Sequence, residues 1–223
     1  MNRLPTIVRQ HLAAFRAMLV FTVVCGIIYP VVMWGVAQVG FTNQANGSMV
    51  SYNGHVVGSS LLCQEFTDAK GNPLPADFQP RPSNADSSSV KDDYGCDPNY
   101  SGAANLGPNN PTLLQDINQL KAQVAKFNGV SQSQVPPDAV TTSGSGLDPD
   151  ISPQYAAIQV NRVAATRHLS VSEVKSLVAK YTDGRSIGIL GEPGVNVLKL
   201  NIALDELPGQ AQYAGGGQGS NSN

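Results

Sequence analysis

An uncharged run near the N-terminus constrains the fold of this 223-residue chain more than any other feature. The run extends from Ala17 to Ala37. At 1.5 Å per residue, a helix of this length is about 31 Å long, close to the ~30 Å hydrocarbon core of a bilayer. Because backbone polar groups in lipid must be satisfied within the segment, the run predicts one transmembrane helix over residues 17–41. Pro30 lies inside it and predicts a kink.

Basic residues flank this run on one side only. Three arginines precede it with no acidic residue among them, and the next basic residue is Lys70. The arginines are Arg3, Arg9 and Arg16. The positive-inside rule therefore predicts a single-pass protein of the cell membrane, with residues 1–16 cytoplasmic and residues 42–205 forming an extracytoplasmic domain.

A cleaved signal peptide is the competing interpretation of the same run. Gly35-Val36-Ala37 fits a small-x-small cleavage site. However, the apolar region of a signal peptide is usually only ~7–15 residues long, and this run is longer. We therefore favour the anchor, and both interpretations place the main domain outside the cytoplasm.

Composition bears on the class of partner. Lys+Arg 14 against Asp+Glu 16 gives a net charge of −2, so we expect no nucleic acid to bind. The 3 cysteines are too few for a disulfide scaffold and lack zinc-site spacing, so we expect no metal. Cys63 and Cys96 lie on the predicted oxidising side and are able to pair, whereas Cys25 lies in the membrane run. Whether that disulfide forms stays open from the sequence.

The remaining chain predicts an α+β domain with a small sheet and about three helices. Asn53-Gly54, between two short strand-like runs, predicts a hairpin. The proline-rich stretch of residues 71–111 predicts mostly loop. Ile187–Leu190 predicts a short strand, while Val195–Leu204 fits a strand or a helix equally well. The Gly- and Ser-rich residues 206–223 predict a disordered tail.

Capping signals delimit the three helices. The first is predicted from Pro111 to Asn128-Gly129, along an apolar stripe that includes Leu113, Ile117 and Leu120. The second opens at Ser152-Pro153. The third begins at Ser170, whose capping box with Glu173 is followed by a predicted end near Asp183-Gly184.

Catalytic motifs are weak in this chain. Ser143-Gly144-Ser145-Gly146 lacks the ending of a phosphate-binding loop and favours a tight, hydroxyl-rich turn. Ser172 and Lys175 have the spacing of an acyl-enzyme motif but lack its further partners. Arg162 and Arg167 are candidates for fixed ion pairs or partner contacts. Two further sets of residues are candidates. The histidines His11, His55 and His168 are too scattered to favour a catalytic triad or a metal site. The acidic Asp92, Asp93 and Asp97 are able to bind a hard cation, but acidic loops of this kind are more often only solvated.

Several motifs, in one order along the chain, resemble the C subunit of the Kdp potassium-transporting P-type ATPase. The resemblance covers about residues 10–205. Its motifs are Gly26–Pro30, Val57–Leu61, Arg81–Ser83, Asn105–Pro111, Val140–Pro149, Ile151–Pro153, Gln159–Ala164, Leu190–Pro193 and Val195–Leu198.

This resemblance implies a non-catalytic, accessory subunit of a complex that hydrolyses ATP to import potassium with high affinity. The implied partners are a channel-like potassium subunit (KdpA), a P-type ATPase subunit (KdpB), a small membrane peptide (KdpF) and the lipid bilayer. The implied role is in assembly and activity, as a catalytic chaperone that raises the ATP affinity of the pump subunit. Only this family description suggests ATP, because the predicted topology places the domain away from the cytoplasm.

We therefore expect the domain to cap the channel subunit's potassium entrance, the alternative being a stand-alone, membrane-anchored binding module. Partner contacts are expected at Ser143, Gly144, Ser145, Gly146, Asp148, Gln159, Arg162 and Arg167. Some positions depart from the family pattern. Asp150 stands where histidine is common and Gly194 where arginine is common, while Cys63 replaces a usual glycine.

Overall fold

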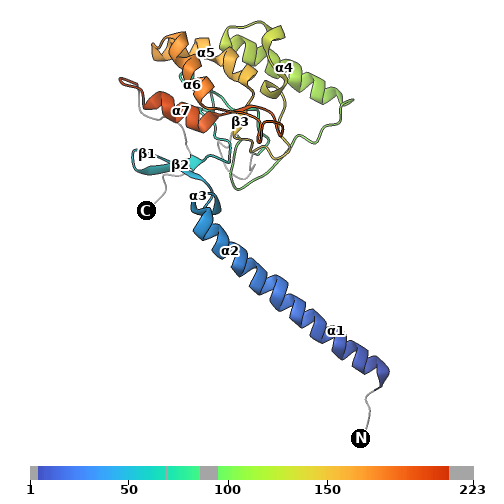
Figure 1. The fold of residues 1–223 in the computed structure, drawn as a ribbon. Coiled ribbons are helices and arrows are strands. Elements are labelled where there is room, and N and C mark those ends of the chain that lie inside the picture. Colours follow the sequence, from blue (N-terminus) through green and yellow to red (C-terminus); the bar gives the residue numbers. More distant parts are fainter. Residues whose placement is uncertain (1–4, 69, 86–94, 211–223) are drawn as a thin grey trace. The chain divides into compact units, whose positions relative to one another are not determined.

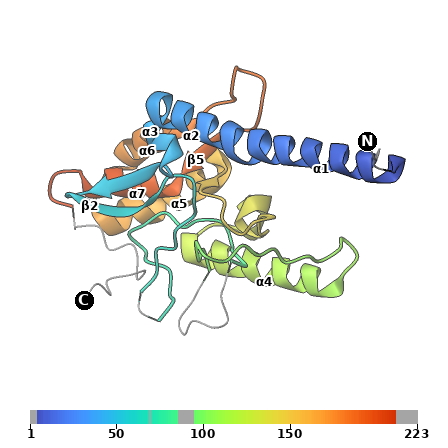
Figure 2. The same ribbon diagram turned by 90° about the horizontal axis from the view of Figure 1, so that it is seen from below.

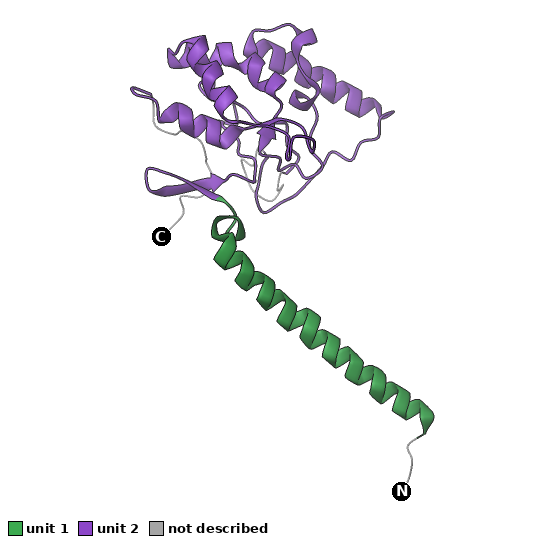
Figure 3. Cartoon of the chain, viewed as in Figure 1, with its two compact units in different colours: residues 1–48 green, residues 49–223 purple. Residues whose placement is uncertain are grey.

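The computed structural model describes residues 5–68, 70–85 and 95–210. The chain divides into two compact units, residues 1–48 and 49–223 (Figure 3). We call the first the anchor and the described part of the second the main domain. Asp92 and Asp93 lie outside the described residues.

The anchor is dominated by one apolar helix. It comprises α1 (Thr6–Val23), a π-helix η1 (Val24–Ile28) and α2 (Tyr29–Gly40), which together form one 35-residue helix with a mean hydropathy of 2.2 in its most apolar window. The short α3 (Thr42–Ala45) follows. None of these elements contains a buried residue, so most of the helix surface is free to meet lipid or another helix.

The position of the predicted kink has a specific backbone irregularity. The π-helix η1 ends two residues before Pro30, whose ring lacks an N–H and crowds the preceding turn. A wider π-turn at this place lets the helix continue past the proline.

The main domain opens with the predicted hairpin. Strands β1 (Met49–Tyr52) and β2 (His55–Ser59) pair in antiparallel orientation. Asn53 and Gly54 between them have φ values of 50° and 81°. Two left-handed residues in succession form the turn that matches strand twist, and this confirms the Asn-Gly prediction.

The helices also begin where their caps predict. They are α4 (Pro111–Asn128), α5 (Pro153–Arg167) and α6 (Val171–Lys180), with 3₁₀ turns η2 (Gln132–Gln134) and η3 (Pro137–Ala139) after α4. Asn110 and Ser152 cap the first two helices, and Gly129 ends α4 with a φ of 65°. The end predicted for α6 near Asp183 was wrong, because the chain after Lys180 turns into a strand.

The small sheet is built from very short strands in the order β3-β5-β4, all antiparallel. They are β3 (Asp150–Ile151), β4 (Thr182–Asp183) and β5 (Gly194–Asn196). Helix α7 (Val197–Asp205) follows β5 directly, so the ambiguous C-terminal segment is mostly helical. The fold class is therefore α+β, with α7 as a further helix.

The strand predicted at Ile187–Leu190 was wrong. Ile187, Gly188 and Ile189 form a turn that joins β4 to β5, closed by a bridge between Ser186 and Leu190. Ile187 and Gly188 have positive φ values, which are incompatible with an extended strand.

The core lies between α5, α6, α7 and the small sheet. Its fully buried members include Phe66 and Phe78 from the loops and Leu198, Leu200 and Leu204 from α7. Figures 1 and 2 show α4 along one side of the domain, where it packs against α5 and contributes Ala125 to the core. After α7, residues 206–210 turn back, and Leu207 packs against this core.

Candidate functional site

Three segments that are far apart in the sequence line one groove of the main domain. They are Pro82–Asn84, Ala103–Leu106 and Val140–Gly144, and α4 forms the remaining wall. The groove has a volume of about 600 Å³. Each segment overlaps one of the motifs that carry the resemblance, so the fold brings these motifs together at one place.

The wall contributed by α4 mixes apolar and polar side chains. Leu113, Ile117 and Leu120 lie on it beside Asp116 and Gln119. An open groove of this mixed character is typical of a contact surface for another protein, whose apolar centre is bordered by polar groups.

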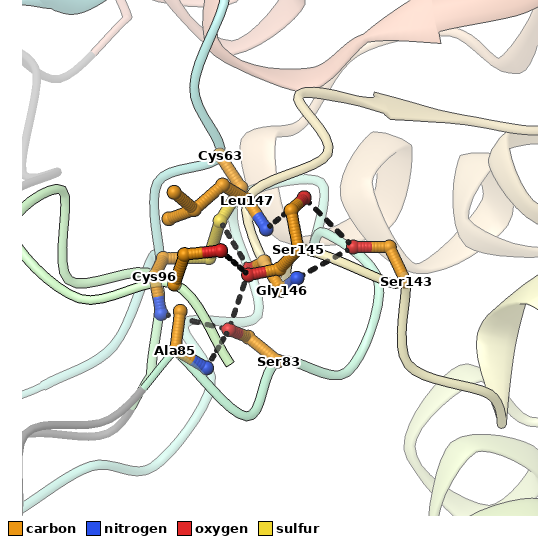
Figure 4. Close-up of a disulfide and its surroundings, with 9 residues drawn as sticks. Cys63, Ser83, Ala85, Cys96, Ser143, Ser145, Gly146 and Leu147 are labelled. Carbon is orange, nitrogen blue, oxygen red and sulfur yellow. Dashed lines mark hydrogen bonds between the residues drawn. A yellow bond between two sulfur atoms is a disulfide. The ribbon is translucent and has the colours of Figure 1, made fainter. Parts of the chain in front are cut away.

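Residues 143–148, which we call the Ser-Gly loop, lie at the edge of this groove. This loop is closed by its own hydroxyl groups (Figure 4). The Ser143 hydroxyl accepts a hydrogen bond from the Gly146 amide at 2.8 Å, and the Ser145 hydroxyl accepts one from the Leu147 amide at 3.1 Å. Both hydroxyls and both amides are thereby used within the loop. This geometry agrees with the predicted hydroxyl-rich turn, because these hydroxyls and amides bond to one another within the loop.

One half-buried side chain ties the loop to two other segments. The Ser83 hydroxyl donates to the Gly146 carbonyl oxygen at 2.6 Å and accepts from the amides of Ala85 and Cys96 at 2.9 and 3.0 Å. Gly146 itself has a φ of 74°, and a Cβ there would lie 2.5 Å from the Gly102 carbonyl oxygen. Only glycine fits this position.

A disulfide lies directly against the same loop (Figure 4). It joins Cys63 to Cys96, with their Cα atoms 5.5 Å apart. The Cys63 amide donates to the Leu147 carbonyl oxygen at 3.0 Å, and the Cys63 sulfur lies 3.2 Å from the Gly146 carbonyl oxygen. The bond therefore holds residues 95–97 against the base of the Ser-Gly loop.

An ion pair holds the other end of the loop. Arg81 Nη1 lies 2.7 Å from Asp148 Oδ2, while Arg81 Nη2 donates to the Thr141 carbonyl oxygen at 3.2 Å. The two side chains are 23% and 43% exposed, so solvent screens the pair and its main effect is to fix geometry.

Side-chain amides of α5 and α7 hold the loop of residues 74–79. Gln159 exchanges two hydrogen bonds with the backbone of Gln79, at 2.8 and 3.1 Å. Asn201 does the same with Phe78, at 2.8 and 2.9 Å. Each amide pairs with both backbone groups of a residue, so these side chains take the place of a neighbouring strand.

The two arginines of α5 hold the same loop. Arg162 donates to the carbonyl oxygens of Pro75 and Asp77 and lies over the Phe127 ring, 4.3 Å from its centre. Burial lowers the pKa of the Arg162 guanidinium to about 10. The guanidinium nevertheless stays charged at neutral pH.

Arg167 forms the most buried ion pairs among the described residues. Its guanidinium nitrogens lie 2.5 Å from an Asp77 oxygen and 2.6 Å from an Asp205 oxygen, and all three side chains are under 10% exposed. Burial raises the pKa of both carboxyl groups, and the adjacent Arg167 partly offsets that rise.

The predicted contact residues therefore separate into two groups. Gln159, Arg162 and Arg167 bind the domain's own loop, and Gln159 is fully buried. The other group lies in the Ser-Gly loop, where Gly144 is exposed and Ser145 and Asp148 are half-buried. Contact of this loop with a partner stays a prediction.

Two of the three departures from the family pattern, Asp150 and Gly194, lie next to each other. A Cβ at Gly194 would lie 3.1 Å from the Asp150 Cβ, so the residues at these positions are in contact across β3 and β5. The Asp150 carboxylate accepts a hydrogen bond from Asn196 at 3.0 Å. Burial raises the pKa of Asp150, and Asp183 adds to the rise.

The candidate catalytic residues are not brought together. Ser172 and Lys175 are both exposed on α6, where the neighbouring Ser170–Glu173 capping box explains the local sequence. The histidines lie on α1, on β2 and at the end of α5. No group of three metal-ligating side chains occurs in the described parts of the chain.

Comparison with known proteins identifies the family. Residues 11–206 match the sequence profile described as "KdpC: K+-transporting ATPase, c chain". The chain belongs to the KdpC family.

Relatives named "Potassium-transporting ATPase KdpC subunit" match over nearly their whole length. The Streptomyces avermitilis protein is 47% identical over 92% of this chain and 97% of its own length. The Mycobacterium bovis protein is 44% identical over 89% and 99%. The Paraburkholderia phytofirmans protein is 48% identical over 84% and 92%. Family membership thus establishes that the chain is a subunit of a potassium-transporting ATPase complex. Its N-terminal apolar helix is suited to single-pass anchoring.

Several residues that organise the site were not found from the sequence. Asp77, Asn201 and Asp205 gave no local signal, because their partners are distant along the chain. An asparagine and an aspartate among the leucines of a helical segment were the available hint, since buried polar residues need partners.

Proposed function

We propose that this chain is an accessory subunit required for assembly and activity of a potassium-importing ATPase, with no catalytic residue of its own. The observation that carries this proposal is the convergence of the family motifs on one groove of the main domain. The motifs hold together a rigid, partly exposed loop rather than a set of reactive groups. Such a surface suits recognition of a partner subunit, because a preorganised loop loses little freedom on binding.

We further propose that the N-terminus is cytoplasmic and the main domain extracytoplasmic. The arginines before the spanning helix favour this orientation. The disulfide supports it, because such bonds form and persist mainly in oxidising compartments. On this topology the partners are the channel-like subunit (KdpA), the P-type ATPase subunit (KdpB) and the small peptide (KdpF).

In this arrangement the main domain covers the potassium entrance of the channel-like subunit. ATP is hydrolysed on the opposite side of the membrane, so the chain raises the ATP affinity of the pump subunit indirectly, through its effect on the assembled complex. The groove between α4 and the Ser-Gly loop is the expected contact with the channel-like subunit.

The test compares the full chain with residues 1–48 alone in cells that lack their own copy. We expect the truncated chain to reach the membrane but to restore no high-affinity potassium uptake. Undiminished uptake with residues 1–48 would overturn the proposal.

A single substitution locates the contact. Thr142→Trp places a bulky side chain at the groove, and Ser172→Trp places the same side chain on the exposed face of α6. We expect uptake to be lost with the first and retained with the second. If both variants fold and transport equally, the groove is not the contact. Purification of the chain without larger membrane subunits would instead favour the stand-alone binding module.

A further inference from the structure

The loop between β4 and β5 exposes an unusual amount of apolar surface. Every residue from Asp183 to Pro193 is exposed. At its end, Ile187, Ile189 and Leu190 are 88%, 75% and 57% exposed. We call these three side chains the apolar tip. Single exposed aliphatic residues are ordinary, but three within four positions at the end of a loop are not.

The loop is held in a defined shape by bonds within itself. The amide of Ser186 and the carbonyl of Leu190 pair at 2.8 Å, and the reverse pair measures 2.9 Å. Below this bridge, one Arg185 nitrogen lies 2.8 Å from both carboxylate oxygens of Glu192. The amides of Gly188 and Ile189 also donate within the loop. The apolar tip is therefore presented by a closed, hydrogen-bonded turn.

The backbone conformation at the apolar tip is energetically unfavourable at one residue. Ile187 has a φ of 56°, in the left-handed region that a β-branched residue rarely adopts. Asparagine or glycine would relieve this cost, and isoleucine there contributes no buried contact in return. A strained residue with a fully exposed aliphatic side chain points to a function outside the isolated chain.

The size and charge of the loop indicate the kind of partner. A stable interface buries about 1,200 Å² or more, and three aliphatic side chains supply only a small part of that area. The partner must therefore be held to this chain by other contacts as well. Insertion into lipid is disfavoured, because residues 183–193 contain no aromatic residue, and their only basic residue is paired with Glu192.

We propose that the apolar tip inserts into an apolar pocket on a membrane-embedded partner subunit of the potassium-transporting ATPase complex. This inference rests on the proposed function, because it requires the chain to work inside that complex. The contact is separate from the groove: α4 and the Ser-Gly loop line the groove, and the tip belongs to the β4–β5 loop.

The test uses the full chain in cells that supply the remaining subunits. The double variant I187N/I189S removes apolar surface, and asparagine suits the positive φ at residue 187, so we expect the thermal unfolding midpoint to be unchanged or slightly higher. Leu114→Ser is the matched control, because Leu114 is a 63% exposed leucine on α4 that does not line the groove.

We expect about tenfold less of the partner subunits to remain with the tagged double variant after extended washing in mild detergent, and about wild-type amounts with the control. A photoreactive residue at position 189 of the otherwise native chain gives a second readout and should crosslink to a partner subunit. Unchanged retention, or crosslinks only to lipid or to a second copy of this chain, would overturn the proposal.

The two proposals fail in different ways. If residues 1–48 cannot support uptake but I187N/I189S keeps its partners, the proposed function stands and the apolar tip is not a contact. If residues 1–48 support full uptake, the proposed function itself fails.

Discussion

Arg167 shows how one buried cation organises the loop beside α5. Its two carboxylate partners come from the loop at Asp77 and from the end of α7 at Asp205. All three charges are removed from water, so each depends on the others for compensation. The helical sequence identified Arg167 as a candidate for a fixed ion pair, but only the fold supplies its partners.

Replacing Arg167 by alanine leaves two buried carboxylates without a cation. We expect a loss of about 3–5 kcal/mol in the free energy of unfolding. Urea unfolding of the detergent-purified chain, followed by circular dichroism, measures it. Lys175→Ala, on the exposed face of α6, is the control and should change the value by about 0.5 kcal/mol or less. Equal losses for the two variants would contradict a structural role for Arg167.

Asp150 predicts a pH dependence whose sign follows from its burial. Because its folded pKa is raised above the unfolded value, the folded state binds the proton more tightly, and stability falls as pH rises from the unfolded pKa through the folded one. Asp150→Asn keeps the acceptor for Asn196 and removes this titration. We therefore expect the variant to be more stable than wild type near pH 7, with the difference vanishing below about pH 3. Thermal melts across this range measure it, and a difference that grows on acidification would refute the assignment.

At the scale of elements, local sequence signals predicted the helices and the hairpin. The remaining short strands depend instead on pairing between segments that are distant in the sequence. Asn110, Ser152 and Ser170 cap their helices through bonds to residues two or three positions away, so the sequence contains the full signal. Strands β3, β4 and β5 are two or three residues long and exist only because they pair across the fold. Val195–Leu204 resolved into β5 and α7 for the same reason.

The Ser-Gly loop was recognised as a turn, but its contacts were not predictable. Ser83, Gly102 and Cys63 approach it from segments that no periodic pattern relates to it. The groove beside it could likewise not be derived, because its walls come from four separate parts of the chain.

Two glycines of this loop should respond differently to alanine. A Cβ at Gly146 would lie 2.5 Å from one backbone atom and 2.8 Å from another, at a positive φ, whereas a Cβ at Gly144 meets nothing within 4 Å. We expect Gly146→Ala to lose about 2–4 kcal/mol in the free energy of unfolding and Gly144→Ala to change it by about 0.5 kcal/mol or less. Urea unfolding of both variants provides the measurement, and equal stability would show that the loop is not held as described.

At the scale of the molecule, the anchor and the main domain are structurally separate units. The hydrophobic core lies entirely within residues 49–210, and no described residue of the anchor helices is buried. The predicted boundary at residue 42 falls seven residues before the division between the two compact units.

A chain that begins at Met49 should therefore fold without the anchor. We expect it to stay in solution without detergent and to unfold cooperatively, with a midpoint within about 5 °C of the main domain's midpoint in the full chain. Calorimetry of both proteins measures this, with the full chain in detergent. Broad, non-cooperative melting of the shorter chain would show that the anchor contributes to the fold.

The positions of the three cysteines allow the side of the membrane on which the main domain lies to be determined by chemical labelling. Cys25 lies on the N-terminal apolar helix as a free thiol, while Cys63 and Cys96 are bonded in the main domain. A thiol-alkylating reagent, applied to denatured protein taken directly from cells, will add one label if the domain was exported and three if it stayed in the reducing cytoplasm. The mass of the untagged chain thus reports its topology, with Cys25 as the internal standard for complete labelling.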